Sequence, residues 1–137
     1  MRDAGLWLAV SAGGAVGAVL RGSVYRLVAA YLRRGDVDRP RRLGLARATL
    51  LVNVVGSFFL GFGAIWLPTL HVSSPVHVFW LTGFCGSLTT FSTFCADAVR
   101  LAGARERGLF AGYLLANCAL SVLAYASGVT LAGVPGP

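Results

Sequence analysis

Four long apolar segments, separated by short polar or arginine-rich stretches, set the pattern along the chain. They cover approximately residues 4–31, 48–67, 76–99 and 109–131. Each has about 20 residues or more, the length that a helix needs to cross the hydrocarbon core of a bilayer. The pattern therefore predicts an all-α integral membrane protein, in which residues 1–137 form a single domain of four transmembrane helices.

The third segment has an unusual centre, where residues 83–94 read Gly-Phe-Cys-Gly-Ser-Leu-Thr-Thr-Phe-Ser-Thr-Phe. Glycine loosens a helix, and hydroxyl side chains compete for its backbone hydrogen bonds. Backbone that is not helical at membrane depth must be buried in protein or line a polar cavity. We therefore predict that this helix is broken near its centre, with loose carbonyls near Gly86 and Thr89. By composition alone, a continuous helix that packs through small residues explains the segment equally well.

Two other segments carry a polar residue at every fourth position, which places these residues in one stripe along a helix. The stripes are Thr49, Asn53 and Ser57 in the second segment, and Tyr113, Asn117 and Ser121 in the fourth. An amide near mid-membrane needs hydrogen-bond partners. Asn53 could hold helices together or face a pore as a donor, and the spacing alone leaves both alternatives open.

One charged residue, Arg21, lies well inside the first segment. An arginine at this depth costs about 2.5–3.5 kcal/mol on insertion scales. Its guanidinium group must therefore reach a cavity, a carbonyl or a partner, or extend along the helix to the nearer interface.

The net charge of +7 comes entirely from arginines, most of which lie between the apolar segments. Six lie between the first and second segments and three between the third and fourth, against one before the first segment. This is the pattern of cytoplasmic loops and not of a nucleic-acid-binding surface, and it places both termini outside the cytoplasm. The few acidic residues lie at or near the segment ends, with Asp97 near the end of the third.

Several function classes fit this pattern poorly. No base, nucleophile or metal cluster shares a site, so we do not expect an enzyme. A small dual-topology exporter coupled to protons would need a titratable group at the centre of the membrane. A membrane scaffold that transports nothing remains an alternative, in which the polar stripes only join helices.

The order of motifs resembles that of the Fluc, or CrcB, family of fluoride channels. Residues 13–21 are similar to the family pattern G-G-x-x-G-A-x-x-R, and residues 49–58 to T-x-x-V-N-x-x-G-S-F. The most specific piece is the stretch of residues 83–94, and Tyr113 with Asn117 gives a looser match. Ser87 stands where the family usually has glycine, and Gly22 stands where an aromatic residue is common.

The resemblance implies an antiparallel dimer with two fluoride pores, which lets fluoride leave the cell passively and so lowers its toxicity. It implies a structural Na⁺ held by the backbone carbonyls of Gly86 and Thr89, and a location in the inner membrane of a bacterial-type cell. The pore residues it implies are Asn53, Phe91, Phe94, Tyr113, Asn117 and Ser121. The arginine bias indicates a fixed orientation, so we hypothesise that the antiparallel partner is an oppositely inserted paralogue. Because the motifs of this chain are complete, a dimer of the chain with itself is the alternative.

Overall fold

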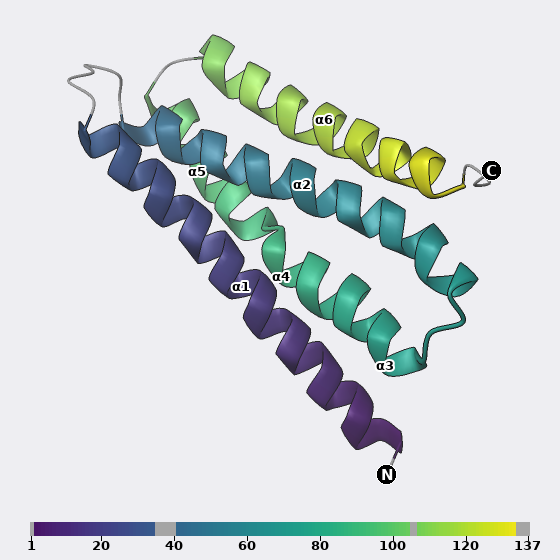
Figure 1. The fold of residues 1–137 in the computed structure, drawn as a ribbon. Helices are drawn as coiled ribbons and strands as arrows, with labels where there is room; N and C mark the ends of the chain where they lie inside the picture. The colour runs from purple at the N-terminus through teal and green to yellow at the C-terminus, as the bar shows by residue number, and fades with distance from the viewer. Residues whose placement is uncertain (1, 35–40, 105–106, 134–137) are drawn as a thin grey trace.

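The chain folds into long helices, shown in Figure 1, in a computed structural model that describes residues 2–34, 41–104 and 107–133. Every regular element in these ranges is helical. The elements are α1 (Arg2–Arg34), α2 (Arg41–Thr69), α3 (Ser74–His77), η1 (Val78–Cys85), α4 (Gly86–Leu88), α5 (Phe91–Gly103) and α6 (Arg107–Gly133).

Four stretches of the described chain are long and apolar enough to cross a membrane. They are Ala4–Arg33, Gly44–Thr69, Ser74–Gly103 and Arg107–Gly133, and the third contains α3, η1, α4 and α5. The predicted all-α membrane fold with a broken third helix is therefore confirmed. Each helix extends beyond the apolar segment that predicted it, because helical hydrogen bonding continues into the polar flanks. The antiparallel dimer stays a prediction.

The broken third span lies between α1 and α2, and α6 lies against the other side of α2 (Figure 1). Two close backbone contacts hold these layers together. A side chain at Gly13 of α1 would collide with the backbone carbonyl of Phe79 in η1, and one at Gly128 of α6 with that of Phe58 in α2. Glycine at these positions therefore lets the helices approach closely.

Two apolar clusters flank the polar centre of the bundle. The first joins Ala46, Ala98, Leu101 and Tyr113 near the arginine-rich end. The second joins Val52, Phe84, Cys85 and Leu88 around η1 and α4. In sequence, the break in the third span lies between these two clusters, so packed helices hold it on both sides.

Candidate functional site

The break in the third span lies at Thr89 and Thr90. Both residues have extended backbone, with φ −76° and ψ 159° at Thr89 and φ −151° and ψ 115° at Thr90. The Thr90 hydroxyl caps the following helix by accepting a hydrogen bond from the backbone N–H of Thr93 at 3.2 Å. The sequence predicted the break within this stretch, and the threonines stabilise it because their hydroxyls replace missing helical partners.

Asn53 of α2 holds the broken backbone from the opposite side. Its Oδ1 accepts a hydrogen bond from the Thr90 N–H at 2.8 Å, and its Nδ2 donates to the Thr90 carbonyl at 3.3 Å. The second Nδ2 hydrogen points to Asn117 of α6, whose Oδ1 accepts at 3.1 Å. Asn53 therefore joins α2, α6 and the break, and the interhelical role predicted as one of two alternatives is present in the structure.

A cleft of about 290 Å³ opens beside the break. Five of the six predicted pore residues line it: Asn53, Phe91, Phe94, Asn117 and Ser121. Ser57, Leu60, Thr89, Thr90 and Cys118 complete the lining. Apart from the backbone and the thiol, its polar groups are amides and hydroxyls, so the cleft offers neutral hydrogen-bond donors without a fixed charge.

Aromatic rings form one border of this cleft. The ring centroids of Phe91 and Phe94 lie 5.7 Å apart, and that of Tyr113 lies 5.5 Å from Phe94. Phe91 is 77% exposed, whereas Phe94 is half-buried. Tyr113, the sixth predicted pore residue, is outside the cleft lining, one helical turn before Asn117 towards the arginine-rich end.

Arg21 lies on the other side of the break. Its guanidinium donates to the Thr89 carbonyl at 3.2 Å, so the side chain reaches a carbonyl at membrane depth. It also lines a second, more polar cleft with Tyr25, Thr90, Ser92 and Thr93. Gly22 borders the same space and has nothing within 4 Å of where a side chain would begin, so this departure from the family pattern leaves the cleft wider.

The carbonyls of Gly86 and Thr89, for which the resemblance implies a bound Na⁺, differ in their hydrogen bonds. Because Thr90 gives its N–H to Asn53, the carbonyl of Gly86 loses its usual helical donor, four residues ahead. Gly86 is exposed and has open space around it. The Thr89 carbonyl accepts from Arg21 and keeps one lone pair for another partner. Ser87 does not interfere, because its hydroxyl bonds to the Phe84 carbonyl at 3.3 Å.

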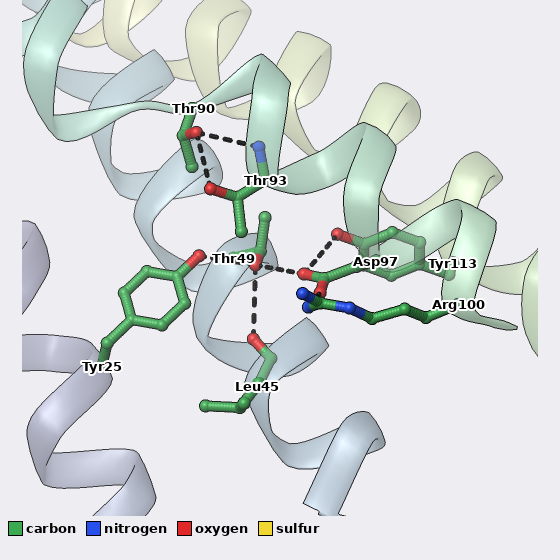
Figure 2. A network of polar contacts seen from close by, with 8 residues as sticks. All are labelled: Tyr25, Leu45, Thr49, Thr90, Thr93, Asp97, Arg100 and Tyr113. Carbon is green, nitrogen blue, oxygen red and sulfur yellow. Dashed lines mark hydrogen bonds and ion pairs between the residues drawn. The ribbon is translucent and has the colours of Figure 1, made fainter.

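Asp97 lies near the end of the third span, as expected, but the sequence analysis did not predict that its side chain is buried. Helix α5 continues to Gly103, and Asp97 is only 3% exposed. Its Oδ2 accepts from the hydroxyls of Thr49 at 2.6 Å and Tyr113 at 3.4 Å, and its Oδ1 from Arg100 at 3.1 Å (Figure 2). The spacing of Phe94, Asp97, Ala98 and Leu101 is that of an inward helix face, a signal that could have revealed this.

The hydrogen-bond network around Asp97 extends to α1 through Tyr25. Its hydroxyl shares a hydrogen bond of 2.6 Å with the Thr49 hydroxyl. Since a hydroxyl has a single hydrogen and Thr49 donates it to Asp97, Tyr25 is the donor in this contact. Four helices, α1, α2, α5 and α6, thus meet at one buried carboxylate, and sequence analysis identified this role for neither Tyr25 nor Thr49.

Fold and site together define a small membrane-spanning protein whose neutral polar groups converge on a broken helix. Comparison with known families agrees: the family model described as "CrcB-like protein, Camphor Resistance (CrcB)" matches residues 8–129. The chain belongs to this family.

Similar proteins extend over nearly the same length. A protein of Saccharophagus degradans is 36% identical over 128 residues, covering 92% of this chain and 88% of its own. A protein of Methanopyrus kandleri is 41% identical with the same coverage, and one of Rhizobium meliloti is 40% identical over 90% of this chain and 93% of its own. All three are named "Fluoride-specific ion channel FluC". The family is therefore one of multi-pass membrane channels and not of enzymes.

Proposed function

We propose that this chain forms a fluoride-selective channel through which fluoride leaves the cell passively, which lowers fluoride toxicity. The observation that carries the proposal is the cleft of amides, hydroxyls and phenylalanine rings at the helix break. Fluoride is small and holds its water tightly, so a pore must replace that water with hydrogen-bond donors and the positive edges of aromatic rings. Neutral donors also bind weakly enough to release the ion, as conduction requires.

The test is fluoride efflux from liposomes that contain only this purified chain, measured with a fluoride electrode in the presence of sodium. We expect rapid fluoride efflux, no chloride efflux, and loss of flux in Phe91→Ile and Asn53→Ala. Leu115→Ala is the control, because Leu115 is 69% exposed and lies outside the cleft lining. If neither this chain nor its co-expressed partner candidates conduct fluoride, the proposal is wrong.

A structural Na⁺ bound by the carbonyls of Gly86 and Thr89 is part of the proposal. The geometry supports it because the Gly86 carbonyl lacks its helical donor and the residue is exposed. A bound cation would also lower the cost of placing an anion in the membrane. Replacing sodium by a large organic cation should reduce both the fluoride flux and the thermal stability of the protein. Equal flux and stability in the two solutions would contradict it.

An antiparallel dimer is the third part of the proposal. The cleft is open and Phe91 at its edge is 77% exposed, so a second chain is needed to close it. The arginine bias favours one fixed orientation, and hence an oppositely inserted paralogue as the partner. Cysteine-accessibility mapping decides between the alternatives, because equal amounts of both orientations would establish a homodimer and remove the paralogue.

A further inference from the structure

The position of Asp97 raises an electrostatic problem for an anion pathway. Along α6, Ser121 and Asn117 line the cleft, and Tyr113 follows one turn closer to the arginine-rich end. The Tyr113 ring stacks on Phe94 and its hydroxyl donates to Asp97. An anion that moves from the cleft towards this end must therefore pass close to a buried carboxylate, which repels it.

We propose that Arg100 is a positioning residue that neutralises Asp97 and so keeps this end of the pathway open to anions. This inference rests on the proposed function. The Arg100 guanidinium donates to Asp97 Oδ1 at 3.1 Å, and this is the only ion pair among the side chains that the structure describes. Arg100 itself is 59% exposed, so its charge is supplied from solvent while the carboxylate stays 3% exposed inside the bundle.

The two oxygens of Asp97 have separate partners, and only Arg100 brings a positive charge to them. Oδ2 accepts from the neutral hydroxyls of Thr49 and Tyr113, which orient the carboxylate without cancelling its charge. Oδ1 accepts from Arg100 alone among the side chains in the network. Loss of Arg100 therefore leaves a carboxylate that is held in place but carries an uncompensated charge.

The test is a charge-compensation series in fluoride-efflux liposomes, with the wild-type chain measured in the same preparation. For Arg100→Gln we expect a roughly tenfold loss of flux, because the uncompensated carboxylate then repels an anion in the pathway, and a repulsion of about 1.4 kcal/mol is a tenfold change in an equilibrium constant. Adding Asp97→Asn to this variant should restore flux within about threefold of wild type, since an amide oxygen still accepts from Thr49. Arg100→Lys should keep the flux near that of wild type, because lysine also carries a positive charge.

Arg107→Gln is the matched control. Arg107 is an exposed arginine at the first turn of α6 and the same end of the bundle, and it does not contact Asp97. If the effect of Arg100 were only a general attraction of anions by surface charge, Arg107→Gln would lose as much flux, and Asp97→Asn would rescue both variants alike. Rescue confined to the Arg100 variant supports the proposal, whereas wild-type flux in Arg100→Gln, or failure of Asp97→Asn to rescue it, overturns it.

Thermal unfolding of the purified variants gives a second readout that does not depend on conduction. Arg100→Gln should unfold at a lower temperature than wild type, and Asp97→Asn in that background should recover the loss, because the buried charge is then removed. Size-exclusion profiles show whether each variant folds. If neither the wild-type chain nor its co-expressed partner candidates conduct fluoride, the proposed function fails and the flux part of this inference falls with it. The unfolding series still decides whether Arg100 neutralises Asp97.

Discussion

The substitution Asn53→Ala tests most directly what stabilises the helix break. It removes the acceptor of the Thr90 N–H and both Nδ2 hydrogen bonds, to the Thr90 carbonyl and to Asn117. Thr90 is 6% exposed, so water does not readily replace the lost acceptor. A buried donor left unsatisfied costs about 1–3 kcal/mol.

The two Nδ2 hydrogen bonds add to this loss. Hydrogen bonds between helices in a membrane bundle contribute on average about 0.6 kcal/mol each. The expected destabilisation is therefore about 2–4 kcal/mol in total. Asn117→Ala is the control, because it removes the contact between the two asparagines and leaves both bonds from Asn53 to Thr90, for an expected loss of about 1 kcal/mol.

The measurement is unfolding in mixed micelles with increasing SDS, followed by circular dichroism at one fixed protein concentration. Asn53→Ala should shift the midpoint at least twice as far as Asn117→Ala. Fluoride flux through liposomes should fall by more than tenfold in Asn53→Ala, because the extended residues at the break are no longer held. If the two variants unfold at the same denaturant concentration, Asn53 does not stabilise the break and this reasoning is refuted.

Three further predictions concern packing, the buried network and the cleft. Gly13→Ala should destabilise the bundle by about 1–3 kcal/mol through overpacking, whereas Gly14→Ala, with open space around it, should not; unfolding midpoints compare the two. Tyr25→Phe should cost about 1 kcal/mol because it removes the hydrogen bond to Thr49, and an unchanged midpoint would exclude that contact. Ser121→Ala should leave the midpoint unchanged but lower fluoride flux several-fold, and unchanged flux would mean that this hydroxyl does not meet the ion.

The sequence predicted the four spans and the break because both depend on local sequence, the spans on apolar length and the break on the order of residues within the third segment. Apolar length determines where a helix crosses the membrane, and the order of glycine and threonine within residues 83–94 determines where it breaks. The polar stripes were also predictable, since residues four apart share a helix face. Asn53, Asn117 and Ser121 do line one cleft.

The contacts that complete the site depend on packing between distant residues, which no local pattern encodes. Tyr25 and Thr49 are 24 positions apart, and Arg21 and Thr89 are 68 apart. The π-helical turns of η1, which shift the helix face before the break, also have no periodic signal in the sequence. Asp97 shows the consequence: its position near the end of the third span was predictable, whereas the burial of its side chain depends on how α5 packs against the other helices.

The hydrogen bonds of the break also restrict which groups remain for an ion. Both N–H groups of Asn53 are used, and the hydroxyls of Thr89 and Thr90 donate to Cys85 and Thr93. The groups that hold the backbone open are therefore unavailable until the structure around them changes. The donors left in the cleft include one N–H of Asn117, whose Nδ2 makes a single bond of 3.5 Å to the Tyr113 carbonyl. They also include the hydroxyls of Ser57 and Ser121, which have no hydrogen-bond partner within the described part of the chain, and the ring edges of Phe91 and Phe94. An ion in this cleft is thus held by few and weak donors, which favours its release over tight binding.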